Sequence, residues 1–313
     1  MSRQWTGGRP TTDGPRIIPT GCGPFGVAIG ADGRAYVTDH RDHAVSVVDT
    51  TSGSVSATIS VGTNPTVIAI AGNSGYVTNA GSGTVSVIDI GSARVADTIV
   101  LGAHPHSVTA SPGGEAVAVS TDAGTVMVVD TASATVLSTI AVGANPRGMA
   151  IGHDGHAYIA NADSNSVSVI DIMSGTTDDT ISVGAHPYSV AITPDGRTVL
   201  VTNADSRTVS VIDTRRHVVV ETIFVDVAPY FVAIAPDGAT AVVTDPSADT
   251  VTIIDVESMR VDDAVRVGAG PTGVTIGSTG VAHVTNYCGN SLSLIDLATS
   301  PRQVNPVARE GYR

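Results

Sequence analysis

Several features that define other classes of protein are missing from this sequence. No stretch approaches the ~20 consecutive apolar residues that a membrane helix needs, so membrane insertion is not expected. Residues 1–13 are polar and lack the apolar core of a signal peptide. The sequence as written therefore predicts a cytoplasmic protein, or a secreted one if a leader has been removed.

Positive charge is also scarce. The chain has 16 basic and 29 acidic residues, which gives a formal net charge of −13. Nucleic acids and anionic membranes are bound through basic faces, so neither is expected as the main partner. No nucleophile elbow, glycine-rich phosphate loop or pair of carboxylates stands out from the rest of the sequence. These absences leave no ready-made catalytic motif.

What the sequence does have is an internal repeat. A proline follows a short, mostly small or polar segment seven times, at intervals of 40 to 42 residues: Pro24, Pro65, Pro105, Pro146, Pro187, Pro229 and Pro271. Each proline opens an alternating apolar run, which an Asp-Gly turn often joins to a second run. A third run of the type Val-Ser-Val-Ile-Asp and a fourth, such as Thr58–Val61, complete the unit. Four short strands every ~41 residues are typical of a propeller blade.

The repeats predict an all-β fold, a seven-bladed β-propeller with four-stranded antiparallel blades. Residues 15–20 match the fourth strand that precedes every other proline, whereas Pro301–Val307 is a poor fourth strand for the last repeat. We therefore expect the N-terminal strand to complete the final blade and close the ring. The expected organisation is a flexible N-terminal tail (1–13), the propeller (14–300) and a C-terminal tail (301–313).

The strand sequences also resemble a known family. Tyr76–Asn79 reads Tyr-Val-Thr-Asn, Val-Thr-Asn recurs at Val201–Asn203 and Val284–Asn286, and Val-Ser-Val-Ile-Asp is found in several repeats. With these motifs, residues ~15–300 resemble the YVTN family of β-propeller repeat proteins. Relatives by this resemblance include surface-layer repeat proteins, lactonase-like propellers, amine dehydrogenase heavy chains and antibiotic-inactivating lyases. The resemblance implies the fold, and each relative has a different site on the same scaffold.

Comparing the seven repeats with one another separates residues that build a blade from residues that do not. The aspartate that closes the third strand occurs in all seven repeats, so we interpret it as a turn-forming residue. The residues on either side of the repeated proline follow no such rule. After the proline they are Phe25, Thr66, His106, Arg147, Tyr188, Tyr230 and Thr272, and before it Gly23, Asn64, His104, Asn145, His186, Ala228 and Gly270.

Both columns flank the crossover from the fourth strand of one blade to the first strand of the next. We call the side of the ring with these loops the crossover face, and the loops between second and third strands should open on it too. The predicted site lies at the mouth of the channel on this face. The candidate catalytic residues are His106, Arg147, Tyr188 and Tyr230, and the candidate ligand-binding residues are Phe25, His40, His104, Asp122, His186 and Tyr287.

Three kinds of chemistry fit these residues. The first is binding of a small molecule or a protein partner at the mouth. The second is acid–base catalysis of a lyase, lactone hydrolase or cyclase type, with Arg147 holding an anionic group. The third is a divalent metal held by His104, His106 and His186, although the sequence requires no cofactor. We expect a monomer.

The two cysteines provide a separate expectation. Cys22 lies in the crossover loop that enters the first blade, and Cys288 lies in a loop of the last blade on the same face. Ring closure should bring these loops together, which allows a disulfide. A reducing cytoplasm would instead favour two free thiols.

Overall fold

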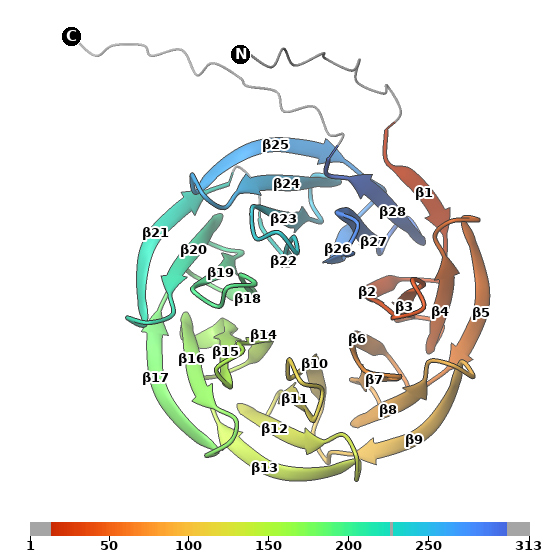
Figure 1. Ribbon diagram of the computed structural model, residues 1–313, viewed down its shortest axis with the longest axis horizontal. Helices are drawn as coiled ribbons and strands as arrows, with labels where there is room; N and C mark the ends of the chain where they lie inside the picture. Colours follow the sequence, from red (N-terminus) through yellow and green to blue (C-terminus); the bar gives the residue numbers. More distant parts are fainter. Residues whose placement is uncertain (1–13, 226–227, 299–313) are drawn as a thin grey trace, which may run out of the picture.

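Seven four-stranded antiparallel sheets are arranged around a common axis in the computed structural model, which describes residues 14–225 and 228–298 (Figure 1). Chain order and sheet order agree within six of the sheets, so each of these blades is a simple meander from the axis to the outside. The predicted seven-bladed propeller is confirmed. The predicted tails, 1–13 and 301–313, lie outside the described residues.

The blades follow the repeats. Blade 1 comprises β2 (Pro24–Ile29), β3 (Ala35–Asp39), β4 (Ala44–Asp49) and β5 (Ser54–Ser60). Blade 2 comprises β6 (Pro65–Ala71), β7 (Ser74–Asn79), β8 (Thr84–Asp89) and β9 (Arg94–Val100). Blade 3 comprises β10 (Pro105–Ala110), β11 (Ala116–Thr121), β12 (Thr125–Asp130) and β13 (Thr135–Ala141). Blade 4 comprises β14 (Pro146–Ile151), β15 (His156–Asn161), β16 (Ser166–Asp171) and β17 (Thr176–Ser182), with a short 3₁₀ helix η1 (Ala162–Ser164).

The remaining blades are less regular at two places. Blade 5 comprises β18 (Pro187–Ile192), β19 (Thr198–Asn203), β20 (Thr208–Asp213) and β21 (Val218–Phe224). Blade 6 comprises a shortened β22 (Val232–Ile234), then β23 (Thr240–Asp245), β24 (Thr250–Asp255) and β25 (Arg260–Arg266). Blade 7 comprises β26 (Pro271–Ile276), β27 (Val281–Asn286), β28 (Ser291–Asp296) and β1 (Arg16–Pro19).

The hydrophobic core lies between the blades. One cluster joins Tyr36, Val45 and Ile59 of blade 1 to Val77 and Ile88 of blade 2, and similar clusters join the other neighbouring pairs. The outer fourth strands are mostly exposed, with one buried isoleucine in each except β25, where Val265 is partly buried. Because each sheet buries its faces against two neighbours, no blade has a complete core of its own.

The N-terminal strand closes the ring as predicted. β1 pairs antiparallel with β28, with Arg16 opposite Leu294. The Arg16 guanidinium also donates to the carbonyls of Thr50 (2.7 Å) and Thr51 (3.2 Å), which links blade 7 to blade 1. Ile18 is buried in the cluster between these two blades. The alternative segment, Pro301–Val307, lies outside the described residues.

The turn-forming aspartates behave as the repeat comparison predicts. Oδ1 of Asp49 accepts from the backbone N–H groups of Thr51 and Ser52, and its counterparts accept from the turns that follow them. These bonds lower the pKa of Asp49 below its ordinary value. A residue that every blade needs for a turn does not mark a single site.

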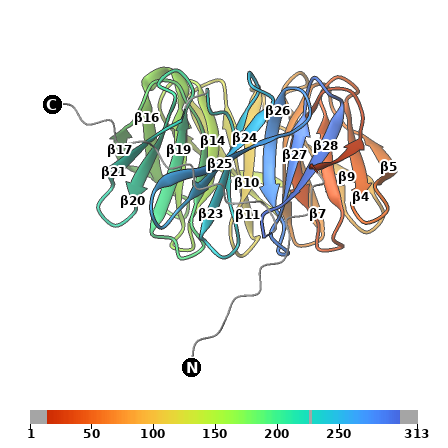
Figure 2. The same ribbon diagram turned by 90° about the horizontal axis from the view of Figure 1, so that it is seen from above.

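Two sets of loops share the crossover face. The N–H of Ala80, in the loop between β7 and β8, donates to the Asn64 carbonyl in the crossover loop, and the Tyr287 N–H donates to the Gly270 carbonyl in the same way. The other turns lie on the opposite face of the ring (Figure 2). The expectation that second-to-third-strand loops open beside the crossover loops is confirmed. Within the described ranges, no helix has the length and apolarity needed to span a membrane.

Candidate functional site

A cavity of about 260 Å³ lies at the mouth of the channel. We call it the mouth cavity; its lining residues are Phe25, His40, Thr66, Val67, Ala80, His106, Ser107, Arg147, Gly148, Tyr188, Tyr230 and Phe231. They come from blades 1 to 6, mostly from the first residues of the innermost strands. All four candidate catalytic residues line it, and so do two of the candidate ligand-binding residues, Phe25 and His40.

Hydroxyl groups from neighbouring blades hold the backbone of these residues in place. Ser120 Oγ of β11 donates to the Arg147 carbonyl at 2.9 Å, and Thr202 Oγ1 of β19 donates to the Tyr230 carbonyl at 2.7 Å. Thr285 does the same for Phe25 at 2.7 Å. The repeat therefore fixes the backbone at the mouth through bonds between blades, while the side chain at this position is free to vary.

A glycine brings two of the functional side chains together. A Cβ at Gly148 would lie 2.8 Å from the Tyr188 carbonyl oxygen and from the Ser189 Cα. Only glycine permits this approach of β14 to β18. As a result Arg147, next to Gly148, lies with its Cζ 5.8 Å from the centroid of the Tyr188 ring.

Arg147 and His106 form the polar side of the mouth cavity. Arg147 Nη1 lies 3.1 Å from His106 Nδ1 and donates to it. Burial, and then the Arg147 charge, lower the pKa of His106 below its ordinary value of 6.5. The imidazole is therefore neutral at pH 7 and can accept this hydrogen bond. Arg147 Nε is buried without a hydrogen-bond partner among the described residues.

Aromatic rings form the adjoining side. Tyr188 and Tyr230 stack with their centroids 3.8 Å apart, and the Tyr230 hydroxyl donates to that of Tyr188. Phe231 meets both rings edge-on, at 5.5 Å and 5.3 Å, and Phe25 packs edge-on against Phe231 at 5.7 Å. Burial raises the pKa of both tyrosines, so they are protonated at neutral pH.

The other four candidate residues lie outside the lining. The Asp122 N–H donates to the His104 carbonyl, and the His104 N–H donates to Asp122 Oδ1. His104 Nδ1 lies 2.7 Å from the Ala80 carbonyl oxygen. His186 has a left-handed backbone with φ of 53°, and its N–H donates to Asn165. Tyr287 packs beside Phe25 and His40, at centroid distances of 6.2 Å and 6.1 Å, as an extension of the aromatic side.

Phe231 is a lining residue that the repeat comparison missed. The residue two places after each proline is Gly26, Val67, Ser107, Gly148, Ser189, Phe231 or Gly273. Phe231 is the one large side chain in this column, and that exception was the available signal. It also lines a second, deeper cavity of about 140 Å³ between the inner strands, so it lies where the two cavities meet.

The three histidines considered for a metal are not gathered. His106 lines the mouth cavity, whereas His104 and His186 belong to the crossover loops outside it. Across residues 14–225 and 228–298, no group of three or more His, Cys, Asp or Glu side chains is placed to hold a metal ion.

The two cysteines lie in adjoining loops but are not bonded. Cys22 and Cys288 are exposed free thiols. Their loops meet, because the Gly23 N–H donates to Asn290 Oδ1 at 2.9 Å and Arg41 packs over the Tyr287 ring at 4.7 Å. The predicted meeting of the loops is thus observed, and of the two alternatives for the cysteines the structure has free thiols and not a disulfide.

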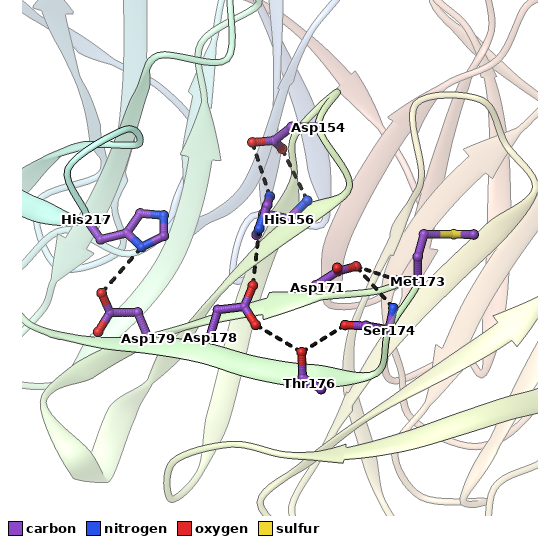
Figure 3. Close-up of polar contacts among 9 residues, drawn as sticks. All are labelled: Asp154, His156, Asp171, Met173, Ser174, Thr176, Asp178, Asp179 and His217. Atoms are coloured by element: carbon purple, nitrogen blue, oxygen red, sulfur yellow. Dashed lines mark hydrogen bonds and ion pairs between the residues drawn. The ribbon is translucent and has the colours of Figure 1, made fainter.

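A second cluster of ionisable side chains lies away from the mouth, near the turns of blades 4 and 5 on the face opposite the crossover loops (Figure 3). This rim cluster consists of Asp154, His156, Asp178, Asp179 and His217. His156 Nδ1 lies 3.2 Å from Asp154 Oδ2, and its Nε2 lies 3.2 Å from Asp178 Oδ2. His217 Nδ1 lies 3.3 Å from Asp179 Oδ2. These histidines connect the outer strand β17 to β15 of its own blade and to the β20–β21 turn of blade 5.

Comparisons with known proteins bear on the fold. The profile of YNCE-like β-propellers matches residues 149–234, which is less than half of the chain, and the YVTN family is not specifically supported. None of the curated proteins compared matches the sequence. Among 1853 matching chains of solved structures is the hydrazine synthase of Kuenenia stuttgartiensis, with a TM-score of 0.80, 23% identity, and coverage of 92% of this chain and 98% of that one. At this identity the likeness shows the propeller fold alone.

Proposed function

We propose that this protein binds a small molecule in the mouth cavity on the crossover face. The observation that carries the proposal is that six of the ten candidate residues named from the sequence line one concavity. Its mixture of aromatic rings with a few polar groups is typical of small-molecule sites. A volume of about 260 Å³ lies just below the ~300–1,000 Å³ of drug-sized sites, which favours a compact ligand over a protein loop.

The test is an unbiased fragment screen on the full chain by ligand-observed NMR. The library should contain acidic, neutral and basic compounds in equal numbers. In a matched pair of variants, Ala80→Phe fills the cavity and Ala204→Phe places the same ring in the equivalent loop of blade 5, outside the lining. We expect hits that Ala80→Phe abolishes and Ala204→Phe retains. If no fragment shows that difference, the mouth cavity is not the binding site.

Acid–base catalysis in the same cavity is a second candidate, and one observation favours it. The lowered pKa of His106 keeps its imidazole neutral, as a general base must be. The raised pKa values of Tyr188 and Tyr230 make the tyrosines poor bases, so their role would be to donate hydrogen bonds. Incubating each screening hit with the protein and looking for a new product by mass spectrometry tests this candidate. Turnover that persists in His106→Gln would contradict it.

A further inference from the structure

We propose that the ligand of the mouth cavity is a small organic anion with a flat apolar body, such as an aromatic carboxylate. The carboxylate would be bound by Arg147 and the ring would lie against Tyr188, Tyr230 and Phe231. This inference rests on the proposed function, since it names the chemical class that the same cavity takes. It is carried by the charge, the donors and the shape of the lining.

The charge of the lining is positive in a protein that is otherwise acidic. Arg147 is the one Arg, Asp or Glu among the lining residues, while the chain as a whole has a net charge of −13. Among the residues that the structure describes, the ion pairs do not include Arg147. A partly buried guanidinium without a counter-ion is costly, because burial removes water and nothing replaces it. An anionic ligand would supply the missing partner.

The donors around Arg147 are also incompletely used. A guanidinium has five N–H groups, and here one of its terminal nitrogens bonds the neutral His106 ring while Nε–H has no acceptor in the described structure. A carboxylate presents two oxygens that match the guanidinium fork, in a charge-assisted bidentate pair. A neutral amide would offer a single oxygen and no charge. A cation would be repelled.

The shape of the cavity sets the rest of the ligand. Stacked and edge-on rings of Tyr188, Tyr230 and Phe231 make one side aromatic and apolar, and the flat rings of aromatic ligands pack on such sides in offset or edge-to-face geometry. A volume of about 260 Å³ accommodates one or two fused rings but not a nucleotide or a peptide. The single positive charge of Arg147 is also too small to bind a polyphosphate.

The experiment compares three probes that share one bicyclic body: 2-naphthoate, 2-naphthamide and 2-naphthylmethylamine. Affinities are measured by calorimetry at pH 7.5 with the full chain. We expect 2-naphthoate to bind at least about tenfold more tightly than 2-naphthamide, and the amine to bind most weakly, because a charge-assisted bond is worth ~1.5–3 kcal/mol and 1.4 kcal/mol is tenfold.

Variants assign the effect to Arg147. Arg147→Met should weaken 2-naphthoate binding about ten- to a hundredfold and change 2-naphthamide binding by less than about threefold. Arg147→Lys, which keeps the charge but loses the fork, should fall between. The matched control is Arg207→Met, which removes a charge from an exposed loop on the same face outside the cavity. Thermal unfolding and circular dichroism check that each variant is folded.

The outcomes separate this inference from the proposed function. The anion inference fails if 2-naphthamide or the amine binds as tightly as 2-naphthoate, or if Arg147→Met leaves 2-naphthoate binding unchanged. It also fails if none of the three probes binds while the fragment screen yields hits that Ala80→Phe abolishes, in which case the binding function stands. A screen without such hits removes both.

Discussion

The mouth cavity and the rim cluster differ in the partners of their basic side chains. In the rim cluster both nitrogens of His156 face carboxylate oxygens, and Thr176 further holds Asp178 through a 2.9 Å hydrogen bond. In the mouth cavity Arg147 faces a neutral imidazole and aromatic rings. The two regions are built on the same repeat, so the difference comes from the side chains alone. Paired charges stabilise a surface, and an unpaired charge in a concavity leaves room for a ligand.

Substitution of Asp39, at the end of β3, is expected to have the largest effect on stability. It is a buried charge on the crossover face with one oxygen, Oδ1, left without a hydrogen-bond partner among described residues. Burial raises its pKa from 3.8 to about 6. A carboxyl with a raised pKa contributes stability below pH 3.8 that is lost as pH rises through about 6. Asp39→Asn should therefore stabilise the fold at pH 8 by about 3 kcal/mol and change little at pH 4.

Chemical denaturation at the two pH values measures this effect. Asn already occupies the same position in Asn79, Asn161, Asn203 and Asn286, so the substitution suits the blade. Asp49→Asn is the control, because turn hydrogen bonds lower the pKa of Asp49, so this substitution should not stabilise the fold at pH 8. A gain at pH 8 in the control as large as that in Asp39→Asn would show that loss of an acidic charge in general, and not burial of Asp39, is the cause.

His106 should make ligand binding depend on pH. Its pKa is lowered by burial and by Arg147, so the ring is neutral at pH 7.5 and becomes charged only in a more acidic range. An anion beside it favours the protonated ring. We expect 2-naphthoate to bind up to about tenfold more tightly at pH 5.5 than at pH 7.5, which is ~1.4 kcal/mol. The probe remains an anion over this range, since carboxyl groups titrate near pH 4. His106→Gln should flatten the profile, and an unaltered pH dependence in that variant would contradict the assignment.

Removing one carboxylate from the rim cluster should have a smaller effect on stability. Asp178→Asn removes one carboxylate from His156, and partly exposed ion pairs are worth ~0.2–1 kcal/mol. We expect a loss of this size in the free energy of unfolding, measured by denaturant titration, because the contact of Asp178 with His156 is lost. Asp205→Asn, an exposed aspartate in a crossover-face loop, is the control and should be neutral. A loss in Asp205→Asn as large as that in Asp178→Asn would show that the contact with His156 is not the cause.

The smallest expected effect is that of Arg147→Met on stability. Because no ion pair is lost among the described residues and the apolar stem is kept, the free energy of unfolding should not fall by more than about 0.5 kcal/mol. Denaturant titration without ligand tests this. A loss above about 2 kcal/mol would show that Arg147 is a structural residue, which would weaken the contrast between the two regions.

The fold could be predicted from the sequence because the same pattern recurs in all seven repeats. Any single blade would be ambiguous, but the spacing of the prolines and the match of β1 to a fourth strand fixed both the number of blades and the closure. The column after the proline also predicted lining residues, because its side chains start the innermost strands. The column before the proline did not: members such as His186 and Asn145 have a left-handed backbone and belong to the loop, a geometry that residue type does not reveal.

Two other features of the site could be identified only from the structure. Phe231 lines both cavities, whereas the residues at the equivalent position of the other repeats are smaller. Only its distances to Tyr188 and Tyr230 show that it belongs to the aromatic side. The pairing of Arg147 with His106 joins two blades, and spacing in the sequence gives no orientation for long side chains. Ring closure brings the two cysteine loops together, but adjacent loops do not by themselves place two sulfur atoms at bonding distance.

The pairing of β1 with β28 has a consequence for biosynthesis. β1 precedes all the other described strands in the chain, and β28, with which it pairs, follows them all. During translation β1 must therefore remain unpaired while six blades assemble after it. Opening the ring at another junction, with the present ends joined by a linker, would let β1 follow β28 directly. A ribosome could then finish blade 7 as a local hairpin, and the rate of refolding would rise as the separation of these partners in the chain fell.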